Sequence, residues 1–326
     1  MNIGIIGSGA WGTAISTIAS DNGHDVLMWA REQDVVDEIN THRTNQRFLQ
    51  GASIAPNVRA TTDIAALCSC QMLVNATPTQ YVRHVLPALD GCDALIVNLA
   101  KGIEIGSHYR VSEIVHEVAP SFKSYAVLSG PSHAEEVIQR MPTTVVCASE
   151  DPECSAVVQR VLSTPTFRVY ASTDVIGVEI GGALKNVIAI AAGIVDGLGL
   201  GDNTKAALIT RGLAEIARLA AALGADAQTL YGLAGLGDLF VTCASRHSRN
   251  RAVGERIGKG ETLAQITATM SAVAEGVTTT RAALELAASV GVELPITEQV
   301  AQILFGGVDP QHAIHALMTR QPRMEH

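Results

Sequence analysis

The chain has 326 residues, of which 47% are hydrophobic and 17% are charged. This length accommodates two domains of ordinary size, each with its own core, and the composition excludes an intrinsically disordered protein. The formal net charge of −9 argues against binding to nucleic acid or an anionic membrane through overall charge. An anionic small molecule would therefore need a local basic pocket.

The N-terminus begins with a strand-like run at residues 2–6 and lacks the basic and apolar regions of a secretory signal. No uncharged run reaches the roughly 18 residues of a spanning helix without glycine interruptions. The six cysteines show neither a C-x-x-C pair nor a metal spacing, and the ten histidines are scattered. We therefore expect a cytoplasmic protein with reduced, mostly structural thiols, no metal, no integral membrane segment and no nucleic-acid partner.

Short β-branched runs alternate with helical patterns in the first half of the chain, which is typical of a parallel α/β sheet. The expected strands are residues 2–6, 25–30, 71–76, 94–99, 125–128, 143–148 and 167–170, and the helical patterns include 11–20, 79–89 and 109–118. After about Ser172 the strand signal stops, and Ala/Leu-rich helical patterns follow at 174–195, 204–223, 249–258, 262–270, 275–289 and 297–305. The sequence predicts an α/β domain over residues 1–172 and an all-helical domain over 173–326.

A glycine-rich turn joins the first strand to the first helix. Its sequence, GSGAWG, places glycines at the spacing G-x-G-x-x-G, which permits a tight turn and close approach of the backbone to a pyrophosphate. Free N–H groups at the start of the helix would meet the anion. A glycine-rich turn between the first strand and the first helix predicts a Rossmann-type, doubly wound domain that binds a dinucleotide. The expected contacts are Gly7, Gly9, Ala10, Trp11 and Gly12.

The second expected strand ends at Arg31, about where NAD enzymes place an acid on the ribose 2′-hydroxyl. An arginine there suits the 2′-phosphate of NADPH, but Glu32 follows immediately, so both NADPH and NADH stay open. Polar turns also follow the later strands at residues 75–78, 99–102 and 129–134. In a doubly wound sheet these turns border the ligand crevice, so Lys101 points there or is an ordinary surface lysine.

Lys185 lies within an almost wholly apolar helical stretch, residues 174–196, where Glu179 is the only other charged residue between the flanking aspartates. A buried ammonium is costly unless it is paired, neutralised or used. At helical spacing, Lys185 shares a face with Gly181 and other small residues, which we interpret as clearance for a ligand near the amine. The competing interpretation is a core lysine whose amine reaches solvent.

Three arginines, Arg246, Arg249 and Arg251, follow a glycine-rich turn and one acid, Asp238. Ser248 is a suitable N-cap, so Arg249 and Asn250 would occupy the first turn of a helix, where an anion is favoured. Arginine adds planar, bidentate recognition of phosphate. The segment predicts a phosphate site, and a solvated charged loop is the alternative.

Together these segments resemble the bacterial-type, soluble NAD(P)-dependent glycerol-3-phosphate dehydrogenases over nearly the whole chain. The motifs that carry the resemblance are GSGAWGTA, NATP, LAKGIE, LSGPSHAEEV, the block from GVEIGGALKNV to ALITRG, GLAGLGDLFVTCASRHSRNR, VAEGVTTT and LPITEQV. The resemblance implies a homodimer and reversible reduction of dihydroxyacetone phosphate to sn-glycerol 3-phosphate for glycerophospholipid synthesis.

The resemblance also implies roles for individual residues. Lys185 would be the catalytic acid and base. Substrate contacts would fall on Lys101, Gly130, Ser132, Lys185, Asn186, Asp238, Thr242, Ser248, Arg249 and Asn250. Cofactor contacts would include Trp11, Arg31, Lys101, Ala134, Arg249, Val273 and Glu275.

Two other functions remain open at this point. A β-hydroxyacid dehydrogenase shares the two-domain plan, but there the asparagine lies four residues after the lysine, whereas Lys185 and Asn186 are adjacent here. A nucleotide sensor without turnover would be expected to lose Lys185 or Arg249, and both are present.

Overall fold

The computed structural model describes residues 1–270, 274–321 and 324. Its first half is an eight-stranded sheet in the order β3-β2-β1-β4-β5-β6-β7-β8. The strands are β1 (Asn2–Ile6), β2 (Asp25–Trp29), β3 (Val58–Thr61), β4 (Met72–Asn75), β5 (Leu95–Asn98), β6 (Ser124–Ser129), β7 (Thr143–Ala148) and β8 (Phe167–Ser172). Six α-helices belong to this half: α1 (Ala10–Asp21), α2 (Gln33–Asp37), α3 (Thr79–Val85), α4 (Val111–Val118), α5 (Ala134–Val137) and α6 (Pro152–Leu162).

The sheet is parallel except where β6 meets β7. The chain between those two strands contains only the four-residue helix α5, whereas a parallel crossover normally carries a full helix. Alternate residues of β4 fill the cores on the two faces of the sheet. Met72 packs in the core that includes α1 and α6, and Leu73 packs in the core that includes α3 and α4. Helices therefore cover both faces, as expected for a doubly wound fold.

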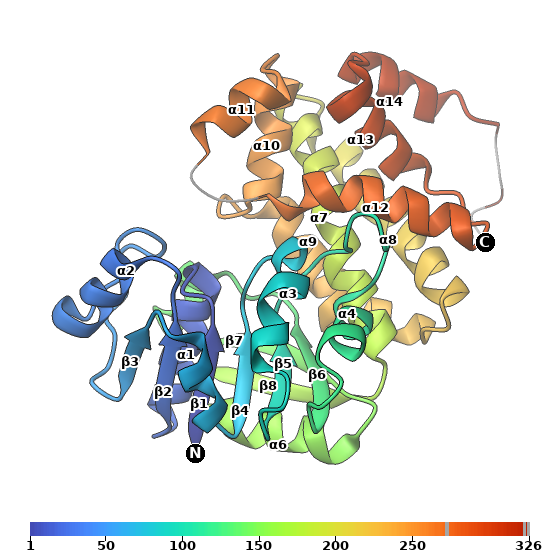
Figure 1. Cartoon of the computed structure of the whole chain (residues 1–326). Coiled ribbons are helices and arrows are strands. Elements are labelled where there is room, and N and C mark those ends of the chain that lie inside the picture. Colours follow the sequence, from blue (N-terminus) through green and yellow to red (C-terminus); the bar gives the residue numbers. More distant parts are fainter. Residues whose placement is uncertain (271–273, 322–323, 325–326) are drawn as a thin grey trace.

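The described residues after β8 form helices joined by short loops and contain no strand. The α-helices of this second half are α7 (Val175–Gly197), α8 (Gly201–Ala222), α9 (Asp238–Ala244), α10 (Arg249–Gly258), α11 (Leu263–Thr269), α12 (Glu275–Ser289), α13 (Pro295–Gly306) and α14 (Pro310–Met318). Helix α7 is central, and α8, α9, α10, α12 and α13 pack against it. Figure 1 shows α10 to α14 gathered above the sheet, with α7 between the two halves.

Among the described residues, one helix, α7, has the length and apolar composition that a membrane-spanning helix needs. The sequence predicted a helical pattern over residues 174–195, and α7 spans nearly the same range. However, 94% of its most apolar window is buried within the protein. The helix therefore forms the core around which the second half is built.

The structure adds elements that the sequence did not predict. Strand β3 is a four-residue edge strand, too short for a clear alternating pattern. Helices α9 and α14 were also not predicted. The expected helix at residues 79–89 ends as an α-helix at Val85 and continues as the 3₁₀ helix η3 (Leu86–Leu89), because Pro87 lacks an N–H group.

The cysteines also differ from expectation. Cys68 and Cys92 form a disulfide, which corrects the prediction of reduced thiols throughout. The two residues are 24 positions apart, and the fold brings their Cα atoms to 4.9 Å. That proximity depends on tertiary packing beside the sheet, so no local spacing revealed it. The other four cysteines are free and buried.

Candidate functional site

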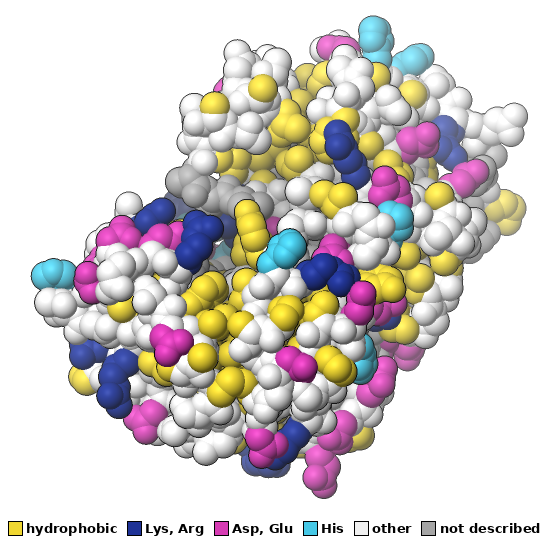
Figure 2. Space-filling view, viewed as in Figure 1, with side chains coloured by type: hydrophobic (Ala, Val, Ile, Leu, Met, Phe, Trp, Pro, Cys, Tyr) yellow, Lys and Arg dark blue, Asp and Glu magenta, His cyan; other side chains and the backbone are white. Residues whose placement is uncertain are grey.

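A cleft of about 660 Å³ lies between the sheet and the helical half. The turns that follow β1, β4, β5 and β6 line one wall, and residues of α7, α9, α10 and α12 line the other. This is the carboxyl edge of the parallel strands, where doubly wound folds bind their ligands. Figure 2 shows the indentation between the two halves on one face of the molecule.

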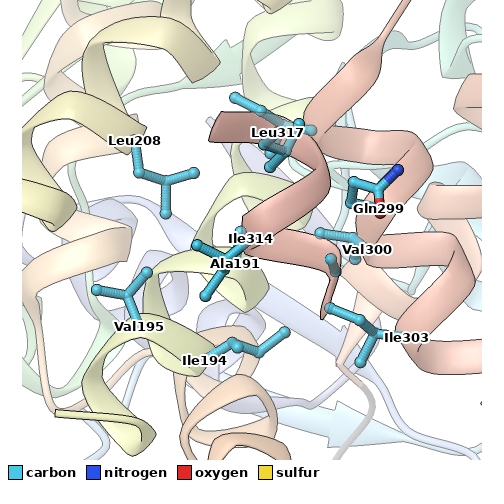
Figure 3. Close-up of a pocket in the computed structure, with 11 residues that line it drawn as sticks. Ala191, Ile194, Val195, Leu208, Gln299, Val300, Ile303, Ile314 and Leu317 are labelled. Carbon is cyan, nitrogen blue, oxygen red and sulfur yellow. The ribbon is translucent and has the colours of Figure 1, made fainter. Parts of the chain in front are cut away.

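A second, apolar cavity lies between the later turns of α7 and helices α8, α13 and α14 (Figure 3). Its volume is only about 40 Å³. Ligand pockets usually measure about 300–1,000 Å³, so the large cleft is the candidate site.

The glycine-rich turn has the geometry that a pyrophosphate requires. Gly7 has a φ of +104°, and Gly9 is the N-cap of α1. A Cβ on Gly12 would collide with the carbonyl oxygen of Gly7, so only glycine lets the helix approach the strand so closely. Gly7, Gly9, Ala10 and Trp11 line the cleft, whereas Gly12 lies behind them. The open N-terminus of α1 thus faces the place of an anion.

Charges of both signs surround the end of β2. The side chain of Arg31 is 78% exposed and pairs with Glu32 at 3.0 Å. Arg47 approaches the same carboxylate at 3.9 Å. Figure 2 shows Lys and Arg side chains beside Asp and Glu in this region, over α2. Two cations therefore offset the acid that would otherwise repel a 2′-phosphate.

Two lysines from different halves of the chain share one buried carboxylate. Lys101 Nζ, after β5, donates to Asp238 Oδ2 at 2.7 Å and to the Gly130 carbonyl at 3.2 Å. Lys185 Nζ, on α7, donates to Asp238 Oδ1 and, at 2.9 Å, to Thr242 Oγ1. Both lysines line the cleft, whereas Asp238 is only 1% exposed and lies behind them. The arrangement holds two ammonium groups at the cleft surface.

The pKa values of Lys185 and Asp238 are both shifted downward, for different reasons. Burial lowers the pKa of Lys185 to about 8; the charge of Asp238 opposes this shift and that of Lys101 adds to it. Burial would raise the pKa of Asp238, but the charges of Lys101 and Lys185 outweigh burial and lower it. Lys185 can therefore change its protonation state near neutral pH while Asp238 stays ionised.

The glycines before Lys185 have a different use from the one expected. A Cβ on Gly181 would lie 2.7 Å from the Ala234 carbonyl oxygen, in the turn η5 (Leu233–Gly237). A Cβ on Gly182 would lie 2.9 Å from Ser129 Oγ. These glycines give clearance to neighbouring protein segments rather than directly to a ligand, which corrects the earlier interpretation.

A chain of amide hydrogen bonds joins both halves beside the lysines. Asn186 Nδ2 donates to the Lys101 carbonyl at 3.0 Å, and Asn186 Oδ1 accepts from Asn250 Nδ2 at 2.9 Å. Asn250 Oδ1 in turn accepts from the Gly276 N–H at 2.9 Å. Both asparagines line the cleft, but their amides hold the surrounding helices together. The Asn250 side chain thus uses its Oδ1 and one Nδ2 proton within the protein, while the residue itself lines the cleft.

The three arginines near α10 do not form one cluster. Arg251 is bound to Asp196, which also pairs with Lys205 at 2.8 Å, and Arg246 is exposed and does not line the cleft. Arg249 lines the cleft at the first position of α10. Its guanidinium makes no hydrogen bond or salt bridge to the residues that the structure describes. Arg249 is thus the arginine available to an anion.

Ser248 and Ser132 complete the sequence-predicted part of this wall. Ser248 caps α10, because its Oγ accepts from the Arg251 N–H at 3.2 Å. The N–H groups of Arg249 and Asn250 then lie at the helix start, where an anion is favoured. Ser132 Oγ donates to the Gly130 carbonyl at 2.8 Å. Both serines line the cleft, whereas Gly130, with a φ of +137°, lies behind Ser132.

Glu275 links the two walls. It begins α12, lines the cleft and accepts a hydrogen bond from the Thr79 N–H of α3 at 2.9 Å. Burial raises the pKa of its carboxyl, although the Thr79 hydrogen bond and Arg249 oppose the shift. Ala134, at the start of α5, also lines the cleft. The predicted contact at Val273 lies outside the described residues.

The structure adds two histidines that sequence reasoning left unassigned. His133 and His247 line the cleft with their ring centroids 5.8 Å apart. Burial lowers the pKa of His133, and Lys185 lowers it further. His133 lies between Ser132 and Ala134, both named as contacts, and that neighbourhood was the available signal. Within residues 1–270, 274–321 and 324, no group of three or more His, Cys, Asp or Glu could hold a metal.

Comparison with known proteins finds the same family over both halves of the chain. Residues 2–155 match the N-terminal part, and residues 174–315 the C-terminal part, of NAD-dependent glycerol-3-phosphate dehydrogenase. Proteins named glycerol-3-phosphate dehydrogenase (NAD(P)+) are similar over their whole length. The one from Chlorobium phaeobacteroides is 48% identical, with 100% of both chains covered, and the one from Geobacillus thermodenitrificans is 50% identical, with 99% and 96% covered.

A solved structure has the same architecture. The crystal structure of glycerol-3-phosphate dehydrogenase from Coxiella burnetii superposes with a TM-score of 0.93 at 37% identity. The match covers 98% of this chain and 99% of that one. The arrangement of sheet, central helix and helical half is therefore that of a known enzyme.

Proposed function

The chain belongs to the family of NAD-dependent glycerol-3-phosphate dehydrogenases, and on that premise we propose how its own residues carry the reaction. The enzyme is an oxidoreductase that uses NADH or NADPH to reduce dihydroxyacetone phosphate reversibly to sn-glycerol 3-phosphate. When bound, the reduced nicotinamide supplies the hydride. The residues of the cleft bind and orient the substrate and move the proton.

Lys185 is the proposed acid and base. As hydride reaches the C2 carbon, negative charge develops on the carbonyl oxygen, and the Lys185 ammonium stabilises that charge and donates the proton. In the reverse direction, neutral Lys185 accepts the proton of the C2 hydroxyl. The amine of Lys185 lines the cleft while it is held by Asp238 and Thr242, and this is the observation that carries the proposal. Burial lowers the pKa of Lys185 to about 8, so the amine can perform both steps.

Asp238 and Thr242 orient Lys185, because both bind its amine. Lys101 holds a second positive charge at the same surface and contacts the substrate. Asn186 positions Lys101 through the Lys101 carbonyl group. Asp238 therefore acts through the two lysines, since it does not itself line the cleft.

The phosphate binds at the start of α10. Arg249 and Asn250 line the cleft in the first turn of α10, and Ser248 caps that helix. The N–H groups of these two residues and the Arg249 guanidinium would hold the phosphate. Gly130 and Ser132 border the substrate from the turn after β6. Anchoring the phosphate at one point places C2 at a constant position relative to Lys185.

Residues on the sheet side of the cleft would hold the cofactor. The turn of Gly7, Gly9, Ala10 and Trp11 would hold the pyrophosphate, and Gly12 allows the close packing of α1 beneath that turn. Arg31 contacts the adenosine ribose or its 2′-phosphate. Further contacts are proposed at Lys101, Ala134, Arg249, Val273 and Glu275.

We further propose that residues 1–172 and 173–326 are separate domains, with the nucleotide-binding site in the first. The protein acts in the cytoplasm as a homodimer without an integral membrane segment and supplies glycerophospholipid synthesis. The Cys68–Cys92 bond joins segments beside the sheet, away from the residues that line the cleft. Its opening in a reducing compartment would leave the cleft residues in place.

A spectrophotometric assay tests the proposal. Dihydroxyacetone phosphate is added to protein with NADH or NADPH, and loss of the reduced-nicotinamide absorbance is followed. We expect turnover that depends on both protein and substrate. Cofactor binding without turnover would instead indicate a nucleotide sensor, and turnover with a β-hydroxyacid alone would indicate the related dehydrogenase class.

A further inference from the structure

Glu179 is a buried acid on α7 that has no place in the cleft, since only 6% of its surface is exposed and it does not line the cavity. We propose that Glu179 is a positioning residue for the reaction: its carboxylate fixes α7, and with it Lys185, against the nucleotide-binding half. This inference rests on the proposed role of Lys185.

The carboxylate of Glu179 accepts four hydrogen bonds, all from the first half of the chain. Its Oε1 accepts from the Ser112 N–H at 2.8 Å and from the Tyr125 hydroxyl at 2.5 Å. Its Oε2 accepts from Arg110 Nη1 at 3.0 Å and from Ser112 Oγ at 2.6 Å. Two bonds to each oxygen saturate the acceptor capacity of a carboxylate. The donors come from the start of α4 and from β6, so the contact joins α7 to two elements of the sheet half.

A carboxylate is an expensive choice for this location. Burial raises the pKa of Glu179 even though Arg110, Ser112 and Tyr125 all oppose the shift. A well-packed apolar side chain could provide stability without that cost. Directional hydrogen bonds provide something that apolar packing lacks, because they define one axial position and one rotation of the helix.

The axial position and rotation of α7 are poorly determined by its apolar side chains. Its sequence, VIGVEIGGALKNVIAIAAGIVDG, is composed mostly of Gly, Ala, Val and Ile, which offer few shape features to set a register. Within α7, Glu179 and Lys185 are the two charged residues before Asp196. Glu179 faces α4 and β6, whereas the amine of Lys185 faces α9.

The same helix connects the contact to the chemistry. Lys185 follows Glu179 by six residues, which corresponds to about 9 Å along the helix axis. The nicotinamide is proposed to bind on the sheet half, whereas Lys185 belongs to the helical half. A shift of α7 relative to β6 would therefore change the position of the Lys185 amine relative to the nicotinamide. Misplacement by about 1 Å can slow catalysis by about 100-fold.

The chain provides a matched control in Glu215 of α8. Glu215 is also buried, at 1% exposure, and its carboxylate accepts hydrogen bonds from the Ile296 N–H, the Thr297 N–H and Thr297 Oγ1 at 2.7–2.9 Å. Burial raises its pKa as well. These bonds join α8 to α13 within the helical half and involve no residue of the cleft. Glu215→Gln therefore removes a comparable buried charge without loosening α7 from the sheet.

The experiment compares Glu179→Gln, Glu215→Gln and Tyr125→Phe in the full-length protein. We measure kcat with dihydroxyacetone phosphate, the Kd for NADPH, the Tm, and the primary deuterium isotope effect on kcat with deuterated NADPH. For Glu179→Gln we expect kcat to fall about 10- to 100-fold, with the Kd for NADPH within about twofold of wild type. The isotope effect should be at least as large as in wild type, because the hydride step becomes slower.

Glu215→Gln should lose Tm but keep kcat within about twofold, since its effect is confined to stability. Tyr125→Phe removes one hydrogen bond and retains the Arg110 pair, so kcat should fall in the same direction as in Glu179→Gln but less. This variant also decides the matter if Glu179→Gln does not fold. Equal kcat losses in the two glutamate variants would overturn the proposal. Unchanged kcat in Glu179→Gln, or in Tyr125→Phe, would overturn it as well. Absence of turnover in the wild type would instead refute the proposed function.

Discussion

Asp238 allows the pKa of Lys185 to be tested by a single substitution. Its carboxylate lies between two ammonium groups and is 1% exposed. Asp238→Asn keeps the shape of the side chain and removes its charge. Lys185 would then be a buried cation that faces Lys101 without a neutralising anion. Burial and the positive charge of Lys101 both favour the neutral amine, so the pKa of Lys185 must fall.

The size of the fall follows from Coulomb's law. Two unit charges about 3 Å apart interact by about 5.5 kcal/mol at an effective dielectric constant of about 20, equivalent to about 4 pKa units. The amide retains part of this interaction through a hydrogen bond to the amine, so we expect about half of the shift. The pKa of Lys185, about 8 in the wild type, would then be about 6 in the variant.

The direction of catalysis decides the sign of the effect. Reduction of the ketone requires protonated Lys185, so kcat is high below the pKa and decreases as the pH rises through it. The midpoint for reduction should therefore move down by about 2 pH units in the variant. Oxidation of glycerol 3-phosphate requires the neutral amine, so its kcat should rise with pH around the same midpoints.

The assay is the pH dependence of kcat in both directions at saturating substrate, where protonation of the unbound substrate does not limit the rate and the midpoints belong to the enzyme–substrate complex. Asp309→Asn is the control, because Asp309 is the N-cap of α14 and lies outside the cleft. It should leave both midpoints unchanged. A midpoint for reduction in Asp238→Asn that is equal to or above that of the wild type would refute the electrostatic account of Lys185.

Three further predictions concern the anion sites and the thiols. Arg249→Ala should raise the KM for dihydroxyacetone phosphate about 10- to 100-fold through loss of charge-assisted hydrogen bonds, and an unchanged KM would exclude the phosphate role. Arg31→Ala should lower kcat/KM for NADPH about 3- to 10-fold more than it lowers kcat/KM for NADH; the effect is modest because the arginine is exposed. Equal losses with the two cofactors would show that Arg31 does not select between them. Thiol counting on denatured protein should give four thiols before reduction and six after it, with kcat unchanged by the reductant; six thiols at the outset would contradict the disulfide.

The sequence was most informative where a local pattern has a direct structural meaning. The turn of Gly7, Gly9 and Gly12 predicts both the β1–α1 connection and the anion site, because strand, turn and helix are contiguous. The N-cap at Ser248 likewise predicts the start of α10 at Arg249. The change from alternating strands to helices near Ser172 follows from composition and periodicity alone.

Pairings between distant residues were not readable in the same way. Asp196 binds Arg251 and so removes it from the expected phosphate site, although the two lie far apart in sequence. Glu179 was visible as a charge in an apolar helix, but its partners on α4 and β6 were not. The antiparallel entry of β7 and the Cys68–Cys92 bond depend on how segments meet across the sheet. Such features are set by tertiary packing, which a single sequence does not encode locally.

Lys185 is the central claim of the account, and turnover by Lys185→Ala tests it most directly. The variant is compared with wild type and with Lys205→Ala, which removes an ion-paired lysine of the same half that does not line the cleft. We expect reduction of dihydroxyacetone phosphate by Lys185→Ala to slow by about 100- to 10,000-fold, with the Kd for NADPH within about twofold of wild type and Lys205→Ala near wild type. Undiminished turnover by a folded, cofactor-binding Lys185→Ala protein would contradict the assignment of Lys185 as acid and base.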